Sequence, residues 1–191
     1  MGIDPLLIAS HIVTSSQALV SRRVDPKQPC VLSITRFHAG TAYNVIPHTA
    51  TIGGTLRTYD EELRAEFKDI FRELCEKTAE AHGAIAKVEW REGYPVLVND
   101  ARIAALCEEA CQDFFHMKPP LERPDPRSMG GEDMSFYLQE VPGCFLFLGA
   151  HNKEVGACYN HHHPKFTIDE DSLPLGVELF LRCVEHLGNT L

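Results

Sequence analysis

Residues 30–59 read CVLSITRFHAGTAYNVIPHTATIGGTLRTY and decide the fold of the first part of the chain. Residues 30–37 are rich in Val, Ile and Thr, which favours a β-strand. Residues 49–59 alternate between apolar and polar side chains, the period of a strand with one buried face, with Ile52 and Leu56 on the apolar side. Residues 38–47 lie between the two patterns and contain turn formers. The stretch therefore predicts two strands joined by a loop.

Helices are predicted on both sides of this stretch. Asp4 followed by Pro5 is typical of a helix start, and the apolar pattern continues to about Arg23. Asp60 caps a second helix that runs to about His82, with apolar residues at helical spacing. After that helix, residues 85–91 alternate and predict a third strand.

The resulting order is helix, strand, strand, helix, strand. It matches a ferredoxin-like βαββαβ layer that lacks its first strand. We therefore expect residues 1–92 to form a domain that is incomplete at its N-terminal end.

Residues 93–191 predict a second, different region. Residues 143–149 enclose a wholly apolar stretch, typical of a strand buried on both faces. One such strand cannot form a sheet alone, so we expect its partners to lie outside this sequence. Helices are predicted over 101–115, about 132–139 and about 171–187, with a proline-rich loop at 119–126.

Composition argues against several classes of partner. The 191 residues include 18 Lys and Arg against 27 Asp and Glu, a net charge of −9. An excess of negative charge disfavours binding to nucleic acid or to anionic lipid, which are themselves negatively charged. No apolar run approaches the roughly 18 residues of a membrane-spanning helix. The seven cysteines are odd in number and no export signal is visible, which predicts free thiols in the cytoplasm.

Three histidines and two cysteines are candidate metal ligands. His161, His162 and His163 are consecutive, so at most two of them point toward one ion; the alternative is a polar surface loop. Cys107 and Cys111 lie four residues apart on a predicted helix. They either face one metal or serve as small apolar core residues.

Gly130 and Gly131 precede a predicted helix. Glycines there let the backbone approach a ligand, and free N–H groups at the helix start attract a carboxylate or phosphate. The alternative is an ordinary loop-to-helix junction with favourable acids in the first turn. Arg57, on the polar face of its strand, either holds a substrate carboxylate in a bidentate pair or is a solvated surface side chain.

Five stretches in this order resemble the zinc aminoacylase/amidohydrolase family, which includes hippurate hydrolase, N-acyl-amino-acid amidohydrolases and auxin-conjugate hydrolases. They are HAGTAYNVIP at 38–47, GTLRT at 54–58, MGGED at 129–133, VPGCFLFLG at 141–149 and HHPKF at 162–166. The resemblance extends from about Asp4 to Leu187, nearly the whole chain.

The resemblance implies an α/β fold with an α+β lid. Residues 1–92 would be most of the ferredoxin-like dimerisation lid, without its first strand. Residues 93–191 would be the C-terminal part of a two-metal, exopeptidase-like catalytic domain. The first half of that domain would lie upstream of this sequence.

The resemblance also implies two-metal hydrolysis, in which the ions, zinc or manganese or cobalt, activate a water and a glutamate acts as general base. Four of the five metal ligands and the general base belong to upstream motifs, so no catalytic residue is assigned here. The remaining ligand matches His162. A role for His38 or Glu132 in catalysis is not supported.

The substrate-binding residues implied by the resemblance are Asn44, Arg57, Gly130 and Gly131. Arg57 would bind the free carboxylate of an N-acyl amino acid, and Asn44 would reach the substrate, in such homodimers often that of the partner subunit. We expect this chain alone to be inactive and to hold no stoichiometric zinc. The alternative is a truncated, non-catalytic dimerisation or binding subunit.

Overall fold

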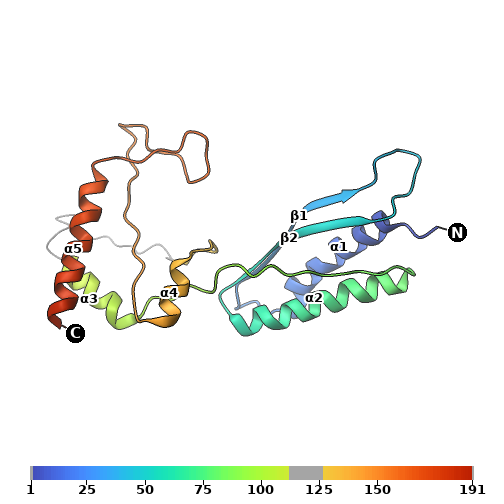
Figure 1. Ribbon diagram of the computed structural model, residues 1–191, viewed down its shortest axis with the longest axis horizontal. Helices are drawn as coiled ribbons and strands as arrows, with labels where there is room; N and C mark the ends of the chain where they lie inside the picture. The colour runs from blue at the N-terminus through green and yellow to red at the C-terminus, as the bar shows by residue number, and fades with distance from the viewer. Residues whose placement is uncertain (1, 112–126, 191) are drawn as a thin grey trace. The chain divides into compact units, whose positions relative to one another are not determined.

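The computed structural model describes residues 2–111 and 127–190, and the chain divides into two compact units (Figure 1). Unit one comprises Met1–Val96 with Arg127–Gly131, and unit two comprises Leu97–Pro126 with Glu132–Leu191. The loop expected at 119–126 lies outside the described residues.

The two helices of unit one begin and end where the sequence predicts. Helix α1 (Pro5–Arg23) starts with Pro5 after Asp4, whose carboxylate accepts hydrogen bonds from two backbone N–H groups of the first turn. Helix α2 (Glu61–Ala81) starts at Asp60, whose Oδ1 accepts the N–H of Leu63 at 2.9 Å. It ends before Gly83, which adopts a left-handed φ of 73°.

The sheet of unit one is an antiparallel pair of strands, β1 (Cys30–Ala39) and β2 (Ala50–Thr58). The register shifts by one residue between Ile34 and Arg36, which is a β-bulge opposite Gly53 and Gly54. A methyl group on Gly54 would lie 2.0 Å from the carbonyl oxygen of Ser33. The close approach of the two backbones at the bulge therefore requires glycine at position 54.

The core of unit one lies between the hairpin and the two helices (Figure 1). On each helix, the side that carries the predicted apolar residues is buried in this core. Phe67, with 2% of its surface exposed, is the most deeply buried large side chain of the core. The predicted alternation of β2 is also confirmed, since Ile52 and Leu56 pack against this core. The buried members are Ile8, Ile12, Leu19, Leu32, Phe67, Phe71, Cys75 and Ala79.

The third strand predicted at 85–91 is not a hydrogen-bonded strand. Its alternation is real, because Ala86, Val88 and Trp90 pack against the core while Ile85, Lys87 and Glu89 are exposed. The described residues place no second strand beside it, so no ladder forms. The prediction was right about the two faces of the segment and wrong that it forms a strand among the described residues.

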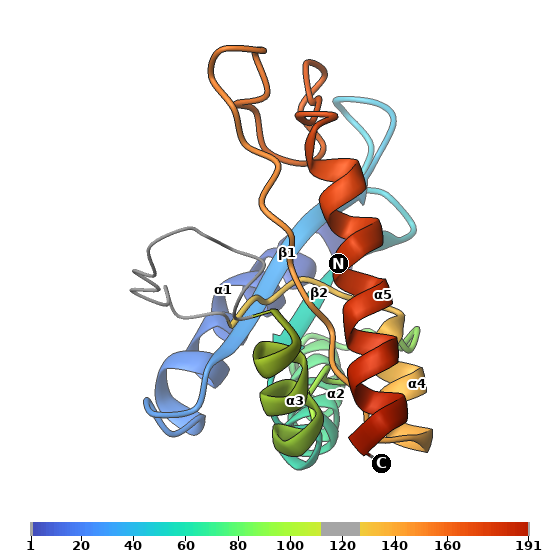
Figure 2. The same ribbon diagram turned by 90° about the vertical axis from the view of Figure 1, so that its left-hand side faces the viewer.

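The described residues of unit two form three helices, α3 (Ala101–Cys111), α4 (Met134–Glu140) and α5 (Ser172–Thr190). Asp100 caps α3 by accepting the N–H of Ile103 at 2.9 Å. Helices α3 and α5 pack side by side (Figure 2). Their buried contact is made by Ile103, Cys107, Leu179 and Cys183.

The buried strand predicted at 143–149 is also absent from the described structure. Phe147 is 78% exposed and Leu146 44% exposed. The side chain of Asn99 takes the place of a neighbouring strand: its Nδ2 donates to the Phe145 carbonyl at 3.0 Å and its Oδ1 accepts the Phe145 N–H at 2.8 Å. The sequence analysis expected the partner strands of this segment to lie outside this sequence, and without a partner among the described residues the segment is exposed and forms no strand.

Within the described residues, none of the helices combines the length and apolarity needed to cross a membrane.

Candidate functional site

Arg57 lies on the outer face of β2, away from the core. It pairs across the hairpin with Val31, and its side chain is exposed. One Nη1–H donates a hydrogen bond to the carbonyl oxygen of Met129, so the described structure brings Arg57 to the segment that carries the two predicted glycines. A guanidinium has five N–H donors in a planar fork, and this bond uses one of them.

Gly130 and Gly131, which follow the Met129 carbonyl bound by Arg57, have little room for a side chain. A methyl group on Gly131 would lie 2.7 Å from Cδ2 of the Tyr94 ring, and one on Gly130 would lie 3.2 Å from the Ser128 hydroxyl. Neither glycine has a positive φ, so close approach is what favours glycine here. Tyr94 is the residue that sequence reasoning missed, and its only signal was an aromatic side chain between Gly93 and Pro95.

The start of helix α4 does not present free N–H groups to an anion. The Glu132 carboxylate accepts the N–H of Met134 at 3.5 Å, and the Glu132 carbonyl accepts the Ser135 hydroxyl at 2.5 Å. The helix has only seven residues, and Asp133 at its N-cap makes no side-chain capping bond. These contacts favour an ordinary loop-to-helix junction over an anion site at this point.

Asn44 is exposed in the loop that joins β1 to β2. This loop lies at the start of α1, because Cδ1 of Ile46 is 3.7 Å from the position of a methyl group on Gly2. The next residue, Ile3, reaches within 3.4 Å of the corresponding position on Gly83, just beyond the end of α2. Asn44 is therefore at the C-terminal end of α2.

Arg57 is at the opposite end of the same helix, because β2 ends at Thr58 and α2 begins at Glu61. The 21 residues of α2 span about 30 Å at ~1.5 Å per residue. Asn44 and Arg57 of one chain are thus separated by about this length. They cannot both touch one small molecule unless two chains contribute.

The two histidines that flank His162 are engaged by aromatic neighbours. The ring of His163 stacks on Tyr159 with centroids 4.3 Å apart, and its Nδ1 accepts the N–H of Lys165 at 3.0 Å. The ring of His161 meets Phe166 edge-on at 4.9 Å. These contacts hold both side chains within the loop.

His162 differs from its neighbours in backbone and side chain. Its φ of 67° is the only positive value among the described non-glycine residues. Its imidazole is exposed and makes no hydrogen bond or ring contact with the described residues. A strained backbone that projects an unengaged imidazole is a feature found at functional sites.

The described residues do not form a metal site on their own. They contain no group of three or more His, Cys, Asp or Glu side chains placed to hold an ion. Zinc sites in proteins use about three or four protein ligands, and His162 offers one. Cys107 is buried in the contact between α3 and α5 and Cys111 packs against that contact, which favours the core interpretation of that pair.

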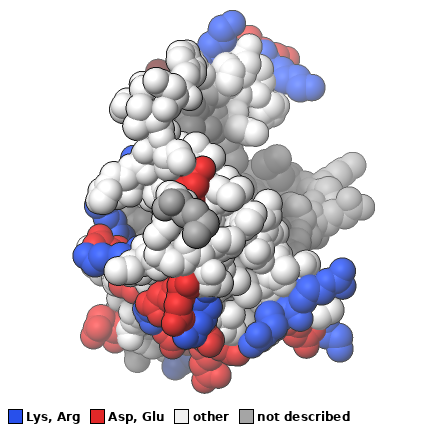
Figure 3. Space-filling view, turned by 90° about the vertical axis from the view of Figure 1, so that its right-hand side faces the viewer, with Lys and Arg blue, Asp and Glu red and all other residues white. Residues whose placement is uncertain are grey.

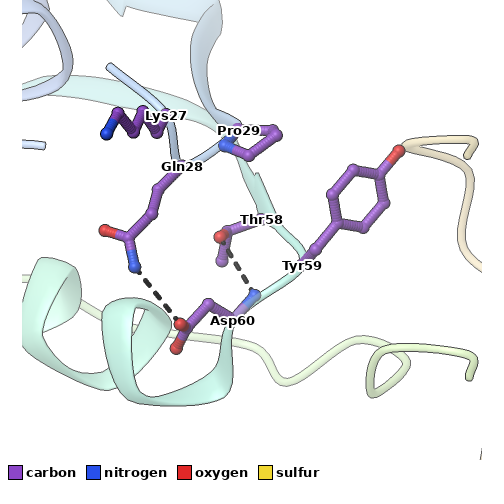
Figure 4. A pocket seen from close by; sticks show the side chains of 6 residues that line it. All are labelled: Lys27, Gln28, Pro29, Thr58, Tyr59 and Asp60. Carbon is purple, nitrogen blue, oxygen red and sulfur yellow. Dashed lines mark hydrogen bonds between the residues drawn. The ribbon is translucent and has the colours of Figure 1, made fainter. Parts of the chain in front are cut away.

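A pocket of about 200 Å³ lies at the junction of β2 and α2, next to Arg57 in sequence (Figure 4). Its polar groups already bond to one another: Gln28 Nε2 donates to Asp60 Oδ2 at 3.4 Å, and the Asp60 N–H donates to Thr58 Oγ1 at 3.2 Å. The ring of Tyr59 points away from this pair in Figure 4. The pocket is therefore formed where two turns meet through hydrogen bonds between their own polar groups. Its lining residues are Lys27, Gln28, Pro29, Thr58, Tyr59 and Asp60.

Charged side chains on the face shown in Figure 3 are mixed in sign. Lys and Arg lie beside Asp and Glu along its lower edge, and its centre is largely uncharged. This face therefore carries no broad basic area of the kind that binds a phosphate backbone.

The sequence profile of peptidase family M20/M25/M40 matches residues 8–186. The chain belongs to this family. It is 38% identical over 173 residues to an N-acetyl-L-cysteine deacetylase of Bacillus subtilis, covering 90% of this chain and 39% of that protein. It is 34% identical over 181 residues to an IAA-amino acid hydrolase (ILR1-like 4) of Arabidopsis thaliana, covering 93% of this chain and 41% of that protein.

A solved structure of a member of the same family has a similar fold. The Bacillus subtilis YXEP protein, described as a dinuclear metal-binding peptidase of the M20 family, matches 99% of this chain with a TM-score of 0.78 and 30% identity. That match covers 48% of the longer protein. This chain thus spans less than half the length of these relatives. The family resemblance seen in the five sequence stretches is confirmed.

Proposed function

We propose that this chain is part of a metal-dependent amidohydrolase that cleaves the amide bond of N-acyl amino acids. Its relatives include a deacetylase of an N-acetyl amino acid and a hydrolase of indole acetic acid–amino acid conjugates, whose substrates share an acyl group on an amino acid. The structural observation that carries the proposal is the exposed Arg57 held beside the glycine segment at Met129–Gly131.

Arg57 would recognise the free carboxylate of the substrate. A carboxylate is bound best by a planar pair of parallel N–H donors. The bond to the Met129 carbonyl fixes one edge of the guanidinium and leaves the other donors to form that pair. Gly130 and Gly131 would let the backbone approach the substrate next to the arginine.

Asn44 would act in the site of a partner subunit. The separation of about 30 Å along α2 places it beyond reach of a small substrate bound at Arg57 of its own chain. A homodimer formed through residues 1–92 solves this problem, because each chain then supplies Arg57 to one site and Asn44 to the other. This assignment makes residues 1–92 the dimerisation lid and residues 93–191 the C-terminal part of the catalytic domain.

The lid interpretation also accounts for two features of residues 84–92. The segment has one face on the core but no paired strand among the described residues, and the Trp90 indole Nε1 is buried there without a described hydrogen-bond partner. A first strand of the ferredoxin-like layer, supplied from outside this sequence, would pair with the segment and complete the sheet.

His162 would provide one ligand to a metal ion, zinc or alternatively manganese or cobalt. Its exposed, unengaged imidazole supports this role over His161 and His163, which are held by aromatic neighbours. The family resemblance implies that the remaining ligands and the general base belong to motifs outside these 191 residues, and turnover would then require those motifs as well. We place the complete enzyme in the cytoplasm, where seven unpaired thiols are stable.

A transplant into the Bacillus subtilis deacetylase tests this function. The segment of that enzyme that matches this chain is replaced by residues 8–186, and hydrolysis of N-acetylcysteine, other N-acetyl amino acids and hippurate is measured. We expect turnover that His162→Ala abolishes and that Arg57→Ala reduces mainly through KM for the free carboxylate. His161→Ala is the matched control and should retain turnover.

Equal activity of the His162→Ala and His161→Ala transplants would contradict the metal assignment. A transplant that binds metal but cleaves only substrates without a free carboxylate would contradict the role of Arg57. The second candidate function, a non-catalytic dimerisation or binding subunit, is favoured by the open segment at 84–92. It predicts that the 191-residue chain co-purifies with a longer homologue, whereas a lone or aggregated product counts against it.

A further inference from the structure

Two histidines from different helices lie side by side on the surface of unit one. His11 is in the second turn of α1, and His82 is the C-cap residue of α2, whose end lies beside the first half of α1 (Figure 1). His11 Nδ1 is 3.4 Å from His82 Nε2, and the centroids of the two rings are 5.3 Å apart. Both side chains are exposed, so water and ions can reach them. No step proposed above for amide hydrolysis uses either residue.

The geometry of this pair fits a shared metal ion better than a direct hydrogen bond. Hydrogen bonds donated by N–H groups are usually about 2.7–3.2 Å long, so the observed 3.4 Å is long for one. Two imidazole nitrogens that bind one tetrahedral zinc ion at ~2.05 Å lie about 3.3 Å apart, and their ring centres about 5.2 Å apart. A straight N–H···N bond of 3.4 Å would instead separate the ring centres by about 5.7 Å. The observed nitrogen and centroid separations therefore both agree with two rings that converge on one ion.

The backbones that carry the two rings are fixed by the core of unit one. Ile8 and Ile12, on either side of His11 in α1, are buried in the same cluster as Ala79 of α2. The N–H of His82 donates a hydrogen bond to the Ala79 carbonyl at 3.0 Å, which fixes the last turn of α2. The two nitrogens therefore stay close without help from an ion, and such preorganisation reduces the cost of binding.

The end of α2 also favours a cation. The carbonyl groups at the C-terminal end of a helix carry partial negative charge. The last turn of α2 contains no basic side chain that would offset this charge, and the chain as a whole has a net charge of −9. A divalent ion between the two rings would lie at this end of the helix, next to His82.

We propose that His11 and His82 together bind one divalent transition-metal ion, such as Zn²⁺ or Cu²⁺, through Nδ1 and Nε2 respectively. Neutral imidazole is a common ligand of both ions, and Cu²⁺ generally binds such sites more tightly than Zn²⁺. Water completes the coordination, because the described residues place no third His, Cys, Asp or Glu side chain with the pair. Since zinc sites built by proteins use about three or four protein ligands, this two-ligand site is labile and releases its ion on dialysis. When occupied, it joins α1 to the end of α2.

Imidazole ¹⁵N NMR of the full 191-residue chain, titrated with zinc chloride, tests the proposal. Metal binding changes the chemical shift of the nitrogen that coordinates the ion. We expect His11 Nδ1 and His82 Nε2 to shift together, at the same zinc concentration, and EDTA to reverse both shifts. The melting temperature of unit one should rise with added zinc, because the ion binds the folded state.

Matched variants identify the pair as the site. His11→Ala should raise the zinc concentration needed to shift His82 Nε2 by about 10²-fold, since only one of two linked ligands remains, and His82→Ala should do the same for His11. Both positions are exposed, so neither substitution removes a core contact. His151→Ala, at an exposed histidine of unit two, should leave both shifts unchanged. Unshifted rings at millimolar zinc would overturn the proposal, as would a His82 shift that persists at the same zinc concentration in His11→Ala.

Discussion

Gly54→Ala should unfold unit one at a much lower temperature than a substitution at the neighbouring glycine. The added methyl would lie 2.0 Å from the Ser33 carbonyl oxygen and 2.9 Å from the Ile34 Cα, both backbone atoms that no side-chain rotation can move. Ordinary contact begins at 3.4 Å, so the strands must separate by about 1.4 Å at the bulge. We expect a cost of about 3 kcal/mol, the upper part of the range for overpacking, since ladder hydrogen bonds are strained as well.

Gly53→Ala is the matched control on the same strand. Its nearest neighbour would be the Arg36 Cβ at 3.8 Å, an ordinary contact, and Gly53 has no positive φ. Replacing a glycine there also reduces the entropy of the unfolded chain. We therefore expect Gly53→Ala to stay within about 1 kcal/mol of the unmodified protein.

Thermal unfolding followed by circular dichroism, with urea titration for the free energy, measures both variants. A loss of about 3 kcal/mol in a unit of this size corresponds to a fall in melting temperature of roughly 15 °C. If Gly54→Ala and Gly53→Ala melt within a few degrees of each other, the bulge does not require glycine and the argument from close approach is wrong.

Three further outcomes follow from individual contacts. Asp60→Ala should destabilise the chain by about 1 kcal/mol through loss of the α2 cap, whereas Asp133→Ala, at a helix start without a side-chain capping bond, should change the urea midpoint little. The Asn152 amide and the Asp171 backbone N–H hold the pKa of Asp169 below its usual 3.8, so this carboxylate stabilises the folded state above that pH and the effect is lost as pH falls through the lowered pKa. Asn152→Ala should therefore raise the Asp169 pKa in an NMR titration, and an unchanged value would show that the amide contributes nothing. Hydrogen exchange should be faster at the exposed residues of 85–91 than in the paired strands β1 and β2, because the segment lacks a described ladder; protection equal to that of β2 would mean that a partner strand is already present.

Local signals in the sequence were sufficient for the helices and the hairpin of unit one. Asp4 and Asp60 cap α1 and α2 as predicted, because an N-cap interaction involves only residues within one turn. The alternation of residues 49–59 gave the buried face of β2, since side chains of a strand alternate regardless of what they pack against. These features depend on neighbours in sequence, which is why they could be predicted.

Pairing of the two remaining apolar segments could not be predicted in the same way. Residues 85–91 and 143–149 have the side-chain pattern of strands, yet neither has a partner among the described residues. A strand is stable only with hydrogen bonds to another strand. The element order indicated that partner strands were missing from this sequence, but only the structure showed that, without them, neither segment forms a hydrogen-bonded strand among the described residues.

The sequence by itself determined the family, the starts of the helices of unit one and the buried face of β2. It also named His162 as the candidate metal ligand and Arg57 as the candidate binding residue for a substrate carboxylate. Only the tertiary structure decided which of these residues meet. It showed Arg57 bonded to the carbonyl next to Gly130, Tyr94 against Gly131, Asn44 at the far end of α2, and four thiols in one contact between α3 and α5. The physical reason is that capping and alternation act over a few residues, whereas these contacts join positions that are distant along the chain and depend on how whole elements pack.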